Sequence, residues 1–142
     1  MSHVHFFEED ITFTLEHSPQ IIKWLTNIAT SEDRTLIELN YIFCSDEYLY
    51  QMNVDYLEHD TYTDIITFDN SEDEKEIEGD IFISIDRVRE NSKSLATSFQ
   101  EELLRVMAHG LLHLLGYNDK TEEEKTLMRK KEEACLSLFP KL

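Results

Sequence analysis

The chain contains the segment HGLLHLLGYND at residues 109–119. His109 and His113 are four positions apart, so on a helix they project from one face, one turn above the other. Gly116 comes three residues later, and a glycine there can end the helix in a left-handed turn. That turn would carry Asp119 back toward the two histidines. The segment therefore predicts a helix that ends in a metal site formed by His109, His113 and Asp119.

This spacing is that of the long zinc motif H-E-x-x-H-x-x-G-x-x-H, with two departures. Gly110 stands where zinc proteases carry their general-base glutamate, and Asp119 stands where they carry a third histidine. Two nitrogen ligands and one oxygen ligand with an open fourth position are typical of a catalytic zinc. Asn118 is the alternative to Asp119, although an amide is a poor zinc ligand. The other interpretation is a buried helix that happens to carry two histidines.

The missing glutamate bears on the reaction. Peptide hydrolysis is disfavoured, because the usual base is absent from the helix. Zinc can activate water unaided and offsets the charge of a phosphate, so cleavage of a phosphodiester fits better. A base from elsewhere in the chain is the alternative, and the candidates for this catalytic role are Asp64 and His59. For His59, an exposed loop residue without a role is the other interpretation.

Length and composition predict one globular domain over residues 1–142. Hydrophobic residues make up 41% and aromatic residues 11% of the chain, which is enough for a core. No apolar run reaches membrane-spanning length, and the N-terminal segment lacks the features of a signal peptide. We therefore expect a cytoplasmic protein with no membrane partner. Cys44 and Cys135 have no metal-type spacing, so we expect them to be buried thiols in a reducing compartment.

The charge balance opposes a polyanionic partner at long range. Thirty acidic and thirteen basic side chains give a formal net charge of −17, which repels nucleic acid. Two short basic stretches, at residues 87–93 and 129–131, are either ordinary helix surface or local patches that capture RNA. If RNA binds, we expect the metal to be the largest positive charge in the cleft.

Hydrophobic periodicity predicts strands and helices that are intermixed along the chain. Apolar alternation and β-branched residues predict strands within residues 4–15 and at 36–44, 63–68 and 79–85. Capping residues predict helices that begin near Ser18, Ser45, Ser98 and Thr121. A further helix is expected at residues 87–94. We therefore expect an α+β or α/β fold with a mixed sheet of about four strands covered by helices. The helix from Ser98 is apolar almost all round, so we expect it to be the buried central helix with the metal site at its end.

Two helices are assigned inner faces from the same periodicity. In the helix after Ser45 the inward residues are expected to be Leu49, Met52 and Tyr56. In the last helix they are expected to be Leu127, Cys135 and Leu138.

The segment HGLLHLLGY at residues 109–117 resembles the signature of the YbeY family. Asn53, Tyr56, residues 63–68 and residues 79–81 also match that family's motifs in order, so the resemblance spans about residues 35–125. It implies a zinc-protease-like fold and one zinc ion per chain. It also implies an endoribonuclease that acts on single-stranded rRNA, in 16S rRNA 3′-end maturation and ribosome quality control. Components of the small ribosomal subunit are then expected partners, and DNA is not.

The chain departs from this family at two positions. The family's third ligand is typically a histidine after Tyr-Asp, and the residue here is Asp119. The family usually has an arginine directly after the position of Tyr56, and the residue here is Leu57. His59 and Arg87 are the candidates to take the place of that arginine.

The residues expected to bind substrate are Arg87, Tyr56 and Thr63.

Three functions compete at this point. The first is a zinc-dependent endoribonuclease in rRNA maturation. The second is a non-catalytic assembly factor in which zinc holds the fold, and its binding partner is a ribosomal protein or an assembly GTPase. The acidic charge suits this second function, because it attracts basic ribosomal proteins. The third is a zinc peptidase, and the missing glutamate counts against it.

Overall fold

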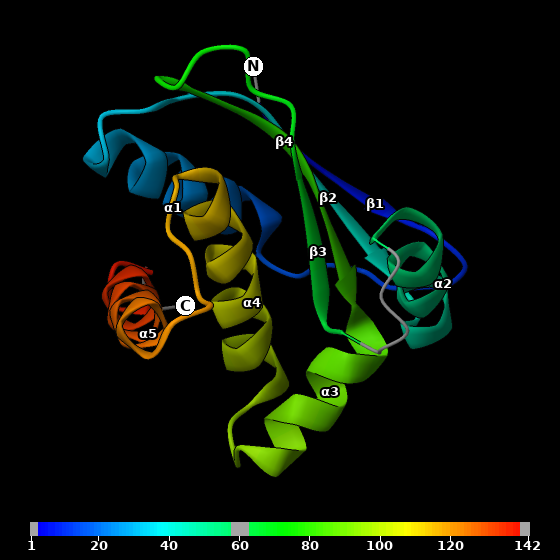
Figure 1. Ribbon diagram of the computed structural model, residues 1–142. Helices are drawn as coiled ribbons and strands as arrows, with labels where there is room; N and C mark the ends of the chain where they lie inside the picture. Colours follow the sequence, from blue (N-terminus) through cyan, green and yellow to red (C-terminus); the bar gives the residue numbers. More distant parts are fainter. Residues whose placement is uncertain (1–2, 58–62, 140–142) are drawn as a thin grey trace.

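The chain folds into a four-stranded sheet with helices on both faces (Figure 1). The structure is a computed structural model that describes residues 3–57 and 63–139. Its elements, in chain order, are β1 (Val4–Glu8), α1 (Ser18–Ser31), β2 (Thr35–Cys44), α2 (Asp46–Leu57), β3 (Ile65–Asp69), β4 (Glu76–Ser84), α3 (Ile85–Ser94), α4 (Phe99–Leu114) and α5 (Glu122–Ser137). None of the helices in these two ranges is long and apolar enough to cross a membrane.

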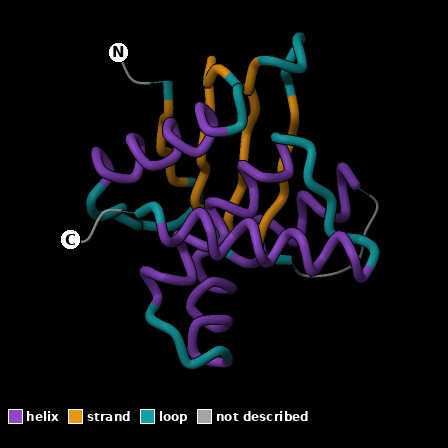
Figure 2. The backbone as a smooth tube through the Cα atoms, turned by 90° about the vertical axis from the view of Figure 1, so that its left-hand side faces the viewer, coloured by secondary structure: helices purple, strands orange, loops and turns teal. Residues whose placement is uncertain are grey.

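The sheet has the strand order β1-β2-β4-β3. β1, β2 and β4 are parallel, and β3 is an antiparallel edge strand that pairs with β4 through Thr67 opposite Ile81. Figure 2 views the molecule from the side of α1 and α5 and shows helices laid across the strands. The class predicted from the sequence, α+β with a mixed four-stranded sheet covered by helices, is confirmed.

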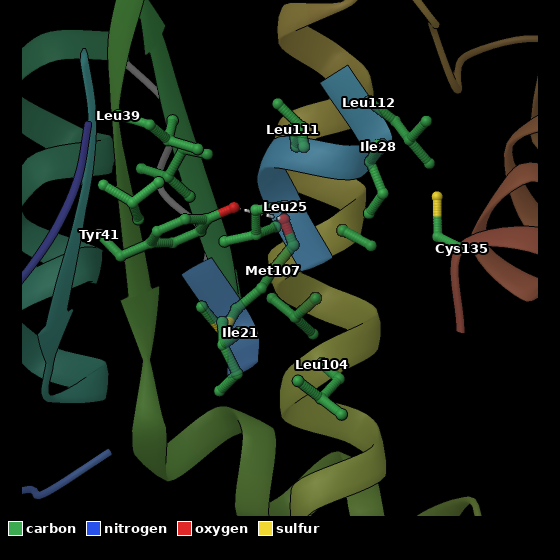
Figure 3. Close-up of a cluster of buried hydrophobic side chains, with 14 of the residues drawn as sticks. Ile21, Leu25, Ile28, Leu39, Tyr41, Leu104, Met107, Leu111, Leu112 and Cys135 are labelled. Carbon is green, nitrogen blue, oxygen red and sulfur yellow. Dashed lines mark hydrogen bonds between the residues drawn. The ribbon is translucent and has the colours of Figure 1, made fainter. Parts of the chain in front are cut away.

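The main hydrophobic core lies between the sheet and helices α1, α4 and α5. Figure 3 shows Tyr41 of β2 reaching from the sheet to α4, where its hydroxyl donates a hydrogen bond to the carbonyl oxygen of Met107 at 2.8 Å. On the far side of this core, Trp24 Nε1 of α1 donates to the carbonyl oxygen of Cys135 in α5 at 2.7 Å. A smaller core packs α2 against the opposite face of the sheet, through Leu49 and Ile66.

Helix α4 is the buried central helix that the sequence predicts. Ser98 caps its N-terminus by accepting a hydrogen bond from the backbone N–H of Glu101 at 3.0 Å. Gly110 lets it lie close to the sheet, because a Cβ at this position would be 2.9 Å from the Cδ1 atoms of both Ile65 and Ile81. A glutamate at position 110 would therefore require the side chains of Ile65 and Ile81 to shift.

Several boundaries differ from the sequence prediction. Residues 11–15 are not a strand, because Asp10 adopts a φ of 50° and turns the chain out of the sheet after β1. β4 begins at Glu76 rather than Gly79, since Thr35 of β2 pairs with Glu76. The N-cap of α1 is His17 rather than Ser18.

The inner faces of two helices also differ from the prediction. In α2 the buried residues are Leu49 and Asn53, whereas the side chain of Tyr56 is 71% exposed. In α5, Cys135 is buried as expected, but Leu127 and Leu138 are exposed and Met128 is buried instead. The buried face of α5 includes Glu132. Because this residue is charged, the pattern of hydrophobic residues alone does not show which face of α5 is buried.

Candidate metal centre

The side chains of His109, His113 and Asp119 converge at the C-terminal end of α4. The Nε2 atoms of the two histidines are 3.0 Å apart, and Asp119 Oδ2 lies 3.2 Å from Nε2 of His109 and 3.4 Å from Nε2 of His113. Ligand atoms about 2.0–2.1 Å from a tetrahedral zinc ion lie about 3.3 Å from one another. The three atoms therefore match one face of a zinc tetrahedron, and the three residues form a group that could hold a metal ion.

Hydrogen bonds on the far side of each ring determine which nitrogen faces this point. His109 Nδ1 lies 2.6 Å from Glu132 Oε2, and His113 Nδ1 lies 3.0 Å from the carbonyl oxygen of Tyr117. Both oxygens accept, so both histidines donate from Nδ1 and a neutral ring presents a bare Nε2. Three lone pairs then face one another, which is unfavourable unless a cation lies between them. The donor set of two imidazole nitrogens and a carboxylate oxygen fits zinc.

The pKa values of the two histidines are displaced in opposite directions. Burial opposes the charged ring of His109, but the hydrogen bond and charge of Glu132, with the charge of Asp119, outweigh it and raise the pKa of His109. Burial and the positive charge of His109 lower the pKa of His113. Glu132 and Asp119 therefore favour a positive charge at His109, and a bound metal ion would supply one.

The turn after α4 brings Asp119 to the histidines. Gly116 has a φ of 103°, and its N–H donates to the carbonyl oxygen of His113 at 3.0 Å. The N–H of Tyr117 donates to the carbonyl oxygen of Leu112 at 3.0 Å. These two bonds form a Schellman motif, with glycine at its left-handed position, as the sequence predicts.

Replacing Gly116 with alanine is expected to lower the free energy of unfolding by about 1 kcal/mol or more, because a Cβ disfavours the left-handed region. The added Cβ would meet no atom within 4 Å, so the cost comes from the backbone and not from a clash. Zinc affinity should fall as well, since the turn positions Asp119. Urea denaturation and zinc titration measure the two effects, and an unchanged stability with full zinc content would contradict the prediction.

Glu132 of α5 is a further residue of the site, which the sequence pattern does not single out. Its side chain is 8% exposed; one carboxylate oxygen accepts from His109, and the other lies 3.3 Å from Nη1 of Arg105. Arg105 Nη2 also pairs with Glu133 at 2.6 Å. A carboxylate on the outer nitrogen of a metal-binding histidine holds the ring in position and makes it a stronger ligand. One sequence signal could have identified Glu132: it lies four residues after Met128 and three before Cys135, so it falls on the same buried face of α5.

Asp64 lies beside this cluster, directly before β3. A cavity of about 270 Å³ is lined by Asp64 together with His109, Asp119 and Glu132. Burial raises the pKa of Asp64, and the positive charge of His109 partly offsets this effect. The carbonyl oxygen of Asp64 accepts a hydrogen bond from the N–H of Ser84 at 3.0 Å, which ties it to the end of β4. The structure thus brings this predicted catalytic residue to the predicted metal ligands.

The other predicted site residues lie elsewhere. Thr63 donates a hydrogen bond from Oγ1 to the carbonyl oxygen of Ile65 at 3.3 Å, and Arg87 pairs with Asp46 at 2.7 Å. Neither residue, nor the exposed Tyr56, is among the described residues that line the cavity. His59 lies outside the described residues. Of the two basic stretches, that at residues 129–131 reaches the site, because Arg129 is part of the cavity wall.

The fold and the site together define an α+β protein with a candidate metal site, in which three residues from one helix and the turn after it could hold a metal ion. Comparison with known proteins gives the family. The model of the family described as "Endoribonuclease YbeY" matches residues 3–139. The chain is 59% identical over 135 residues to an endoribonuclease YbeY of Cytophaga hutchinsonii, covering 95% of this chain and 94% of that protein. It is 50% identical over 131 residues to one of Amoebophilus asiaticus, covering 92% and 89%. The chain belongs to the YbeY family.

A solved structure supports the fold independently. The solution structure of a Thermotoga maritima protein matches with a TM-score of 0.68 at 24% identity, covering 96% of this chain and 88% of that one. At this identity the match establishes the fold alone.

Proposed function

We propose that this chain is a zinc-dependent endoribonuclease that cuts single-stranded RNA in 16S rRNA 3′-end maturation and ribosome quality control. Its relatives carry the name endoribonuclease YbeY. The observation that carries the proposal is the convergence of one ligand atom each from His109, His113 and Asp119. The cavity beside these three atoms is lined by the carboxylate residue Asp64. A structural zinc site is closed by four protein ligands, whereas the described residues supply three. This counts against a non-catalytic assembly factor.

The residues around the cluster have distinct roles in this proposal. Zinc held by His109, His113 and Asp119 would supply a Lewis acid that polarises a phosphate oxygen and makes water more acidic. Asp64 is the general base, because burial raises its pKa toward the range in which a carboxylate takes up a proton from water. His59 is the other candidate for this role. Glu132 holds the ring of His109 in position.

The substrate contacts are also part of the proposal. Tyr56 exposes its ring at the end of α2, where a base of single-stranded RNA could stack on it. Arg87 and Thr63 are proposed RNA contacts at the ends of the neighbouring elements. The cavity of about 270 Å³ is suited to part of a single strand and not to a duplex. We place the activity on the small ribosomal subunit in the cytoplasm, with neither DNA nor a membrane as partner.

Cleavage of a defined RNA tests this proposal. Zinc-loaded protein is expected to cut a single-stranded 16S rRNA 3′ fragment, to leave the same sequence intact in a duplex, and to lose activity after chelation. Asp64→Asn should lower kcat by about 10²- to 10⁴-fold while zinc remains bound, because the variant cannot accept the proton. Asp69→Asn at the exposed end of β3 is the matched control. If zinc-loaded wild type leaves single-stranded rRNA intact but binds a ribosomal protein, the assembly-factor function replaces this one.

A further inference from the structure

The cavity beside the metal cluster continues away from it along α4. Beyond His109 its wall is formed by Glu102, Arg105 and Val106 of α4, with Leu95 at the end of α3 and Arg129 of α5. Glu102 precedes His109 by seven residues, so it lies two turns away on the same helical face, at a rise of about 10 Å. This is comparable to the reach from a phosphate group to the outer edge of its own base. The cavity therefore offers space next to any phosphate that is held at the metal cluster.

Glu102 is an unusual residue for such a wall. It is 4% exposed, and its Oε1 atom is buried with no hydrogen-bond partner. Burial raises the pKa of Glu102, and the charge of Arg105 opposes this effect. Arg105 itself is hydrogen-bonded to Glu132 and Glu133. Buried carboxylate oxygens are normally hydrogen-bonded, so the unpartnered oxygen of a residue that lines a cavity points to a ligand that supplies the missing donor.

The expected ligand at Glu102 is not a second metal ion. Among residues 3–57 and 63–139, the one group with the geometry to hold a metal is His109, His113 and Asp119, and Glu102 is not part of it. The residues of the wall instead combine a carboxylate residue, Glu102, with the apolar Leu95 and Val106 and with Arg129. Apolar faces and an arginine plane favour a flat ring, and a carboxylate requires hydrogen-bond donors on the edge of that ring.

We propose that the cavity receives one guanine base of the RNA, from the nucleotide next to the phosphate that is cut, and that Glu102 selects this base. Guanine presents two adjacent donors, N1–H and N2–H, which match the two oxygens of one carboxylate. Adenine and cytosine offer one exocyclic amino group on that edge, and uracil offers one imino N–H. This inference rests on the proposed function, because it takes RNA as the substrate.

The test uses zinc-loaded full-length protein and single-stranded RNAs that differ only in the base next to the cut. Wild type is expected to cut at guanosine about tenfold faster than at adenosine, cytidine or uridine, since a bidentate pair discriminates by that order. Inosine, which lacks the N2 amino group, should give an intermediate rate. Glu102→Gln should reduce the preference for guanosine to about twofold or less. Glu101→Gln, at the neighbouring exposed position, should leave it unchanged.

Binding of guanosine 5′-monophosphate gives a second readout that does not depend on cleavage. Chemical-shift titration of zinc-loaded wild type should show tighter binding of guanosine than of uridine 5′-monophosphate, and Glu102→Gln should remove the difference. Guanosine-selective binding without RNA cleavage would refute the proposed function and support the base site. Cleavage with no base preference, a preference that Glu102→Gln retains, or the absence of both cleavage and selective binding would overturn the inference.

Discussion

Replacing His113 with alanine is expected to lower the zinc affinity by more than about 100-fold and to abolish RNA cleavage. His113 contributes one of three converging ligand atoms, 3.0 Å from His109 Nε2 and 3.4 Å from Asp119 Oδ2. Loss of a residue that merely supports a ligand costs about 10- to 100-fold in metal affinity, and loss of a ligand itself costs more. Competition with a chelator of known affinity, together with metal analysis of the purified protein, measures the effect.

Two further variants complete this experiment. His5→Ala removes an exposed histidine on β1 and should leave zinc stoichiometry unchanged. Asp119→Ala should weaken zinc retention strongly, because it removes the oxygen ligand. Tight binding of one zinc per chain by Asp119→Ala would exclude Asp119 from the ligands, and tight binding by His113→Ala would refute the site as a whole.

The second large effect is expected at Glu132, although this residue does not touch the metal position. Glu132→Gln keeps the size of the side chain but removes the charge that Oε2 places 2.6 Å from His109 Nδ1. We expect zinc affinity to fall about 10- to 100-fold, because the ring of His109 becomes a weaker and less firmly held ligand. Isothermal titration with zinc measures the change, and urea denaturation shows whether the fold is retained.

Glu133 offers a matched control for this prediction. It also pairs with Arg105, at 2.6 Å, but its side chain is 58% exposed and it does not contact His109. Glu133→Gln is therefore expected to leave zinc affinity within about twofold of wild type. Equal affinities for Glu132→Gln and Glu133→Gln would show that the hydrogen bond to His109 does not strengthen metal binding.

The convergence of His109, His113 and Asp119 could be predicted from the sequence because it depends on local geometry. A four-residue spacing on a helix and a glycine in a left-handed turn are sufficient to bring the three residues together. The central position of α4 could also be predicted, since its second half is apolar on nearly every side. These features involve one continuous segment, so no knowledge of tertiary packing was needed.

The remaining parts of the site depend on packing between elements that are distant in the chain. Glu132 reaches His109 because α5 packs on α4, and Glu102 faces the cavity because α3, α4 and α5 meet around it. In a single sequence both residues are ordinary acidic positions on amphipathic helices. The spacing of Leu49 and Met52 predicts Tyr56 on the inner face of α2, but the structure exposes this residue.

The hydrogen bond from Trp24 to Cys135 gives the protein a built-in optical reporter. Trp24 is the only tryptophan in the chain, and its indole is fully buried between α1 and α5. Cys135 lies one helical turn after Glu132, the residue that links α5 to His109. Indole fluorescence depends strongly on polarity and hydrogen bonding, so its emission wavelength follows the docking of α5. The intrinsic emission of the unlabelled protein can thus be recorded while zinc is added or withdrawn, and it reports on the helix that supports the metal ligands.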